Sequence, residues 1–122
     1  MSQLGPTAEA LILTALLAGR YVSLHTGAPG NTGASEVAGG SYARQGPVTF
    51  AQAGTNPTVS TNTAAIQFPQ ASAPWGTITH FATWDAVSGG NFLGGDAVTA
   101  SKVVTTGDIA RWEIGTLAVS VD

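Results

Sequence analysis

The side chains best suited to chemistry in this sequence are two histidines and a few carboxylates. His25 and His80 lie far apart in the chain, and in space either could meet Glu36, Asp85 or Asp96. Two imidazoles and one carboxylate form a ligand set for a transition metal. The spacings HxH, HExxH and DxDxDG, which would hold such ligands together locally, are missing. The sequence therefore predicts no metal or cofactor site. It predicts instead that the two histidines are half-buried and hydrogen-bonded to the backbone.

Nucleophilic catalysis has one candidate set of residues. Ser23, His25 and Asp85 could supply a hydroxyl, a base and an orienting carboxylate, the three roles of a catalytic triad. No GxSxG elbow surrounds the serine. The glycine-rich stretch GAPGNTG lacks the lysine and the following helix of a phosphate-binding loop. We therefore expect no catalytic residue and a protein that is not an enzyme.

Aromatic rings with exposed faces would suit sugar binding. The available rings belong to Tyr21, Tyr42, Trp75, Trp84 and Trp112. Trp84 and Trp112 lie on alternating segments, which places them in the core or on a sheet face. Trp75 lies between Pro74 and Gly76 at the start of a strand, and we expect it to anchor an interface. Glycan binding stays open as an alternative function.

The composition favours a surface covered by neighbouring molecules. The 122 residues are 43% hydrophobic and only 9% charged, against roughly 25% charged in an ordinary soluble domain. A net charge of −3 without a basic cluster argues against nucleic acid as a partner. The chain has no Cys, which excludes disulfides and thiolate chemistry. A surface of low charge suits a protein packed against other subunits.

The elements that must position these residues begin with a helix. Residues 1–6 are expected to form an arm and residues 7–18 a helix, with Thr7 as N-cap and Gly19 just after the end. This helix has almost no polar face, so it must be covered by a sheet or by another subunit. The apolar run within it is too short for a membrane span of about 20 residues, and it contains Glu9.

The remainder of the chain has the pattern of short strands. Strands are expected at 21–25, 48–51, 64–68, 77–84, 92–93, 97–99, 102–105, 109–114 and 116–121, with a glycine-rich loop over 26–41. In 77–84, the even and odd positions are expected on opposite faces. About seven to nine such strands predict a mainly β protein: one β-sandwich domain over residues 1–122, of which 21–122 form the strands and loops. A jelly roll is one form of it, and a partly open barrel is the alternative.

Three segments that together span nearly the whole chain are YVSLHTGAPGNTGASEVAGGSYARQGPVTF, NTAAIQFPQASAPWGTITHFATWDAVSGGNFL and ASKVVTTGDIARWEIGTLAVSVD. These segments resemble small virion proteins of tailed phages, a family often labelled tail-fibre or minor structural proteins. The matching positions are Leu24-His25-Thr26, Gly39-Gly40, Tyr42-Ala43-Arg44-Gln45, Trp75-Gly76-Thr77, His80-Phe81, Trp84-Asp85 and Gly89-Gly90. For these the resemblance implies roles in the fold, with Arg44 paired to a carboxylate such as Glu36 or Asp85.

The resemblance implies a structural component of a tailed-phage virion. Similar small β-sandwich domains serve as capsid decoration (cement) proteins. Because the chain lacks coiled-coil heptads and fibrous repeats, this compact role and a place on the capsid surface are favoured. The alternative is a tail, collar, baseplate or tail-fibre component for host attachment, with a host-surface glycan as ligand. Expected partners are other virion proteins and further copies of the chain in a homo-oligomer, but neither nucleic acid nor a membrane.

Ten residues are candidates for the interface that such a role requires. They come from the arm, the helix, the glycine-rich loop, the segment Tyr42-Ala43-Arg44-Gln45 and the start of a strand. They are Leu4, Pro6, Leu13, Leu17, Pro29, Asn31, Glu36, Val37, Arg44 and Trp75.

Overall fold

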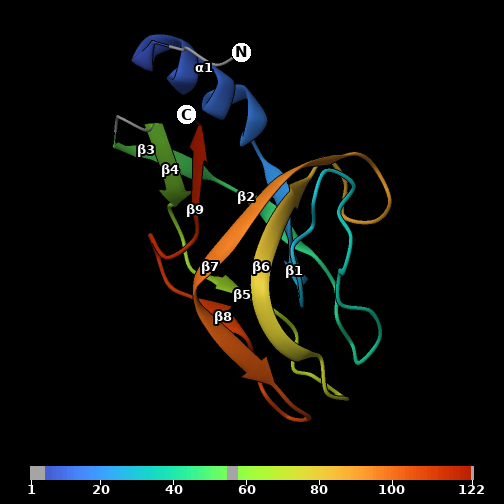
Figure 1. Ribbon diagram of the computed structural model, residues 1–122. Coiled ribbons are helices and arrows are strands. Elements are labelled where there is room, and N and C mark those ends of the chain that lie inside the picture. Colours follow the sequence, from blue (N-terminus) through green and yellow to red (C-terminus); the bar gives the residue numbers. More distant parts are fainter. Residues whose placement is uncertain (1–4, 55–57, 122) are drawn as a thin grey trace.

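The protein is described by a computed structural model that covers residues 5–54 and 58–121. The described residues form one helix and antiparallel strands in three small sheets (Figure 1). The elements are α1 (Pro6–Leu16), β1 (Arg20–His25), β2 (Gln45–Val48), β3 (Phe50–Gly54), β4 (Thr58–Asn62), β5 (Ile66–Gln67), β6 (Gly76–Trp84), β7 (Phe92–Val104), β8 (Arg111–Trp112) and β9 (Ala118–Val121). The prediction of a mainly β, sandwich-like domain with one N-terminal helix is confirmed, while the jelly-roll form stays a prediction.

Helix α1 begins one residue earlier and ends two residues earlier than expected. Its N-cap is Gly5 and not Thr7, because Pro6 occupies the first helical position. Proline suits that position because its fixed φ is helical and it lacks the N–H that would go unpaired there. At the other end, Arg20 Nε donates to the Leu16 carbonyl at 2.7 Å and Arg20 Nη2 to the Ala15 carbonyl at 3.1 Å. The same arginine thus closes the helix and starts β1.

The largest sheet has the strand order β2-β1-β6-β7. Its centre is the β1–β6 pair, in which Tyr21 lies opposite Trp84 and His25 opposite His80. Strand β6 matches its predicted range closely, but its two faces do not differ as expected. Residues 81–84 are all buried, and so are residues 22–25 of β1. This part of the sheet is therefore covered on both sides.

Strand β7 is continuous where three short strands were expected. The residues at 94–96, which were expected to separate two of these strands, pair instead with β6, in which Gly95 lies opposite Ala82. A Cβ atom at Gly95 would come within 2.6 Å of the Phe81 carbonyl oxygen. Glycine at this position therefore serves close approach between two strands, a use that a sequence pattern does not separate from a turn.

The other strands form a second layer. Strands β3, β4 and β9 make a sheet in the order β3-β4-β9, against which α1 packs, and β5 pairs with β8 (Figure 1). Strand β4 falls where no strand was expected, between the segments 48–51 and 64–68. Its buried Asn62 is fully used: Nδ2 donates to the carbonyls of Ala64 and Glu113, and Oδ1 accepts from the Leu117 amide. Because its polar groups are paired, a strand without hydrophobic alternation can lie inside.

The core lies between these layers and contains a cluster of aromatic rings. Phe68 lies at its centre, with ring centroids 6.1 Å from Tyr42, 6.5 Å from Trp75 and 5.8 Å from Trp112. Leu13 and Leu17, from α1 and the turn after it, are buried in the same core. The helix is therefore part of the fold and not an appendage.

Candidate functional site

Ser23 and His25 meet, but inside the protein. Ser23 Oγ lies 2.7 Å from His25 Nε2, and His25 Nδ1 lies 2.7 Å from the Ala34 carbonyl oxygen. Since a carbonyl only accepts, Nδ1 carries the proton, Nε2 accepts, and the Ser23 hydroxyl donates to it. Trp84 Nε1 donates to the same hydroxyl at 2.8 Å. Both ring nitrogens and the hydroxyl are thus occupied.

This pair is not arranged for catalysis. Ser23 and His25 are fully buried, and burial is the main cause that lowers the pKa of the His25 imidazole. Asp85, the third residue of the hypothetical triad, is exposed and accepts from the main-chain amide and the Nδ2 of Asn91. Within residues 5–54 and 58–121 no three His, Cys, Asp or Glu side chains come together as metal ligands. The His25 pair is a hydrogen-bonded part of the core.

Arg44 organises the polar interior next to His25. Its Nε and Nη2 donate to Glu36 Oε2 and Oε1, each at 2.9 Å, and its Nη1 donates to the carbonyls of Ala86 and Gly89. Its guanidinium carbon lies 3.7 Å from the centroid of the Trp84 ring. The predicted pairing of Arg44 with Glu36 is confirmed. We call Arg44, Glu36, Tyr42 and Trp84 the Arg44 clamp.

Charge and hydrogen bonding are balanced within the clamp. Burial acts to raise the pKa of the Glu36 carboxyl, but hydrogen bonds from Arg44 and Tyr42 outweigh it and hold that pKa below its usual range. Burial raises the pKa of the Tyr42 phenol, whose hydroxyl donates to Glu36 and accepts from the Leu24 amide. A hollow of about 400 Å³ opens beside these residues. Because Arg44 and Glu36 neutralise each other, the hollow offers no net charge to a ligand.

The clamp holds two loops in one arrangement. Arg44 and Glu36 belong to the segment between β1 and β2, whereas Ala86 and Gly89 belong to the loop between β6 and β7. Gly33, in the first of these loops, lies so close to the Trp84 ring that a Cβ atom there would come within 2.5 Å of it. The glycine-rich loop expected over 26–41 therefore packs as a cover over the sheet.

The aromatic rings considered for sugar binding are mostly packed inside. Trp75, Trp84 and Trp112 are buried, and Trp75 Nε1 donates to the Gly40 carbonyl at 2.9 Å. Arg44 lies over the Trp84 ring, and Lys102 Nζ lies 4.7 Å from the centroid of the Trp112 ring. Tyr42 is in the core cluster and Tyr21 is half-buried. These rings offer a sugar no open tryptophan face.

The ten candidate interface residues fall into four groups. Pro6 and Asn31 are exposed, and Glu36 and Arg44 pair inside the clamp. Leu4 lies outside the described residues. The remaining five are buried within the chain's own fold, so they are not available as a free surface: Leu13, Leu17, Pro29, Val37 and Trp75.

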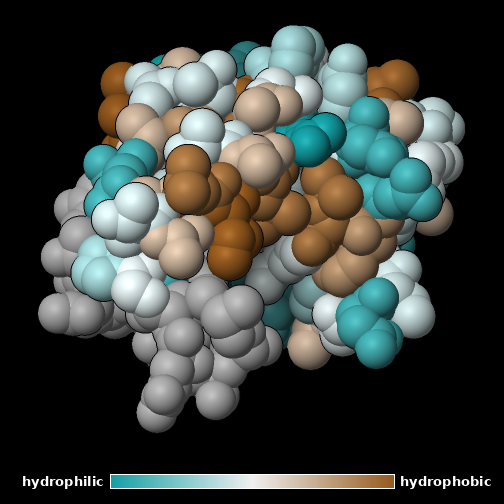
Figure 2. All heavy atoms as spheres, turned by 90° about the horizontal axis from the view of Figure 1, so that it is seen from above, coloured by the Kyte–Doolittle hydropathy of each residue, from teal (hydrophilic) through white to brown (hydrophobic). Residues whose placement is uncertain are grey.

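The exposed apolar surface of α1 lies on different residues. Leu11 is 67% exposed and Ile12 42%, and Thr14 and Ala15 beside them are also exposed. We call these four residues the α1 outer face. Figure 2, which looks onto the α1 end, shows apolar surface gathered there. The only charged residue in α1, Glu9, is buried. Because the helix is apolar all round, its spacing predicted that it must be covered but not which leucines would face out.

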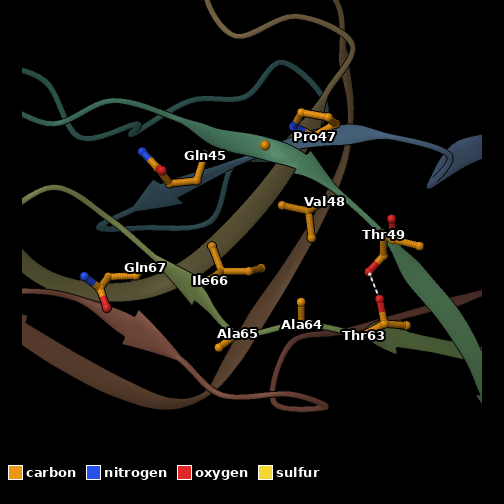
Figure 3. Close-up of a pocket in the computed structure, with 10 residues that line it drawn as sticks. Gln45, Pro47, Val48, Thr49, Thr63, Ala64, Ala65, Ile66 and Gln67 are labelled. Carbon is orange, nitrogen blue, oxygen red and sulfur yellow. Dashed lines mark hydrogen bonds between the residues drawn. The ribbon is translucent and has the colours of Figure 1, made fainter.

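A cleft separates two strand edges on another part of the molecule. It has a volume of about 320 Å³ and is lined by residues 45–49 of β2 and its end and by residues 63–67 leading into β5. Figure 3 shows Val48 and Ile66 on its two sides and the link between Thr49 and Thr63 at one end. That link consists of the Thr63 amide and hydroxyl, which both donate to the Thr49 carbonyl. Sequence spacing gave no indication of this cleft.

Fold and side-chain contacts together define the class of protein: a small antiparallel β domain whose Ser23–His25 pair is a hydrogen-bonded part of the core. No curated protein matches the sequence. The model of the family described as "Podophage GP4 fiber I protein gp80" matches residues 12–120. The chain belongs to this family of phage fibre proteins, and its place is in the virion. The resemblance to phage virion proteins is confirmed at this level. The one helix among the residues that the structure describes lacks the length and apolar character of a membrane span.

Proposed function

We propose that the protein is a non-enzymatic module of a phage fibre that joins a neighbouring fibre chain through the α1 outer face. The observation that carries this proposal is the exposure of Leu11 and Ile12 on a helix whose only charged side chain is buried. An exposed apolar patch on a soluble protein marks a contact site more often than a chance surface. The partner surface that fits it is apolar and uncharged.

The other parts of the molecule agree with a role in assembly. The Ser23–His25 pair is buried and the Arg44–Glu36 pair is neutralised, so neither supplies a reactive group to the surface. Capsid decoration is the alternative role in the virion, and the compact shape and the lack of fibrous repeats support it. The fibre family favours the tail-side alternative. We therefore place the proposed contact in the fibre.

The proposal is tested with Leu11→Glu, which puts a charge on the outer face without touching the core. The matched control is Ile109→Glu, because Ile109 is 53% exposed in the turn between β7 and β8, far from α1 (Figure 1). Both purified variants should melt within a few degrees of the wild type, since surface substitutions change stability little. In phage particles, Leu11→Glu should be incorporated at least tenfold less than Ile109→Glu.

The location of the labelled wild-type chain on the particle is the second readout. Label on the fibre supports the proposal, and label spread over the head in many copies would instead establish the decoration role. Equal incorporation of the two variants would show that α1 is not the contact. The neighbour on the fibre can be another copy of this chain, as the predicted homo-oligomer requires. In that case, cross-linking through the α1 outer face should yield homo-oligomers.

A further inference from the structure

We propose that Asp96 makes an inhibitory contact, which stops the free edge of β7 from pairing with a strand of another copy of the chain. Strand β7 ends the four-stranded sheet in the part of the chain that the structure describes, so β6 alone is hydrogen-bonded to it (Figure 1). It runs from Phe92 to Val104 and is the longest of the described strands. A long edge strand is a template for pairing between molecules unless something blunts it.

The first half of β7 presents main-chain groups on its outer side. Residues 94–97 pair with β6 without a shift in register. In an antiparallel pair, successive residues turn their N–H and C=O groups alternately toward the partner strand and away from it. The Gly94 carbonyl lies on the β6 side, since it accepts from the Thr83 hydroxyl at 3.3 Å. The main-chain groups of Gly95 and Ala97 therefore face outward.

Asp96 occupies one of these outward groups. Its Oδ1 accepts from the Ala97 amide at 3.0 Å. A strand that added to this edge would need the same N–H for its own ladder, so it would first have to displace the carboxylate. Hydrogen bonds to a charged acceptor are stronger than those between neutral groups. This local hydrogen bond is therefore also a barrier to pairing between copies.

The second half of β7 is shaped against pairing in another way. In the ladder with β6, residues 98–101 stand opposite Thr79 alone. Such a bulge bends an edge and interrupts its row of hydrogen-bonding groups. The Thr99 hydroxyl donates to the Thr116 carbonyl at 3.3 Å, which ties the bulge to the segment before β9. The part of the edge before the bulge is therefore where a strand could add, and Asp96 lies in it.

A local block on the edge matters more in this chain than in an ordinary soluble domain. Only 9% of the residues are charged and the net charge is −3, so repulsion between copies is weak. Natural β proteins protect edge strands with charged side chains and with bulges, and β7 carries both. With this edge closed, contacts of the chain are left to other surfaces. The inference uses the geometry of β7 and does not depend on the α1 contact.

The test compares Asp96→Ala with Asp96→Asn, each in a chain that also carries Leu11→Glu, so that the α1 outer face does not contribute to association. Both substitutions remove the same charge, but the Oδ1 of asparagine can still accept from the Ala97 amide. Sedimentation equilibrium should give an association constant about tenfold or more higher for Asp96→Ala, because pairing of two copies displaces one such hydrogen bond in each. Hydrogen exchange of residues 93–97 should slow on association in this variant alone.

Equal association constants of the two variants would overturn the inhibitory role, because the hydrogen bond to Ala97 would then make no difference. Association of Asp96→Ala with unchanged exchange of 93–97 would overturn it too, since the contact would lie elsewhere. Both variants should melt within a few degrees of the Leu11→Glu chain, because Asp96 is half-exposed. If Asp96→Ala does not fold, Asp96→Val replaces it with the same expected result, since valine favours strands. Either failure leaves the α1 proposal untouched, because every chain compared lacks that contact.

Discussion

Arg44 shows how one side chain can set the arrangement of two loops. Its planar guanidinium matches the two oxygens of Glu36, and its remaining arm reaches carbonyls of the loop between β6 and β7. Lysine carries the same charge but cannot make the paired bonds or lie flat on Trp84. The side chain of Arg44 is 9% exposed and that of Glu36 21%, so loss of either partner leaves a poorly hydrated charge.

We predict that Arg44→Ala lowers the free energy of unfolding by about 3 kcal/mol, as expected when one partner of a buried pair is removed. The matched control is Arg111→Ala, whose pair with Glu113 has the same 2.8–2.9 Å geometry but side chains 48% and 67% exposed. Its cost should stay below about 1 kcal/mol. Urea unfolding with unchanged m-values measures both. Equal losses would mean that the clamp is no more than a surface contact.

Helix α1 has two apolar faces with different uses. Leu13 is 1% exposed and packs in the core beside β3, β4 and β9, whereas Leu11 is 67% exposed, on the outer face. Both are leucines of the same helix, so their intrinsic helix propensities are equal. Any difference between them in stability comes from packing alone.

We therefore predict that Leu13→Ala lowers the free energy of unfolding by about 2–5 kcal/mol, because it leaves a cavity in the core. Leu11→Ala should change it by less than about 0.5 kcal/mol. Thermal or urea unfolding of the two purified variants provides the comparison. A large loss for Leu11→Ala in the isolated chain would show that its side chain supports the fold, and the outer face would then lose its proposed role in assembly.

Over the whole molecule, His25 and Glu36 both make stability fall on acidification. The pKa of His25 is below its ordinary value of 6.5, chiefly because of burial, and the pKa of Glu36 is below its ordinary 4.5. In both cases the unfolded chain binds the proton more readily than the folded chain. Stability is therefore fully present above the ordinary pKa of each group and is lost as the pH falls through the folded-state value.

We predict that the free energy of unfolding is constant near pH 8 and falls in two stages on acidification. The first begins below about pH 6.5 and approaches about 1.4 kcal/mol per pH unit, the limit for one proton. The second begins below about pH 4.5, because the carboxyls of Glu36, Asp85 and Asp108, whose folded-state pKa values are lowered by hydrogen bonds, take up protons more readily in the unfolded chain. Urea titrations across pH 3–8 measure both stages, and His25→Gln should lack only the first. A first stage that persists in His25→Gln would assign it to another group.

The class of fold and the range of strand β6 could be predicted from the residues alone, and the family resemblance implied a carboxylate partner for Arg44, either Glu36 or Asp85. Short alternating segments separated by glycine and proline predicted the β domain, and strand β6 was predicted nearly to its ends. The structure chose Glu36 for this partner, while Asp85 accepts from Asn91. The absence of catalytic spacings agreed with a structural role because chemistry at a site needs residues held at set distances.

Which side of each element is buried became clear only from the packing of the elements on one another. The alternation in β1 and β6 was overridden because the loop between β1 and β2 covers the face of the sheet that alternation left open, which buries Ser23 and His25 together with Val22 and Leu24. The leucines of α1 could not be sorted into core and surface because every side of the helix is apolar. The cleft between β2 and β5 joins residues from two separate strand edges, and such edges meet only when the chain is folded.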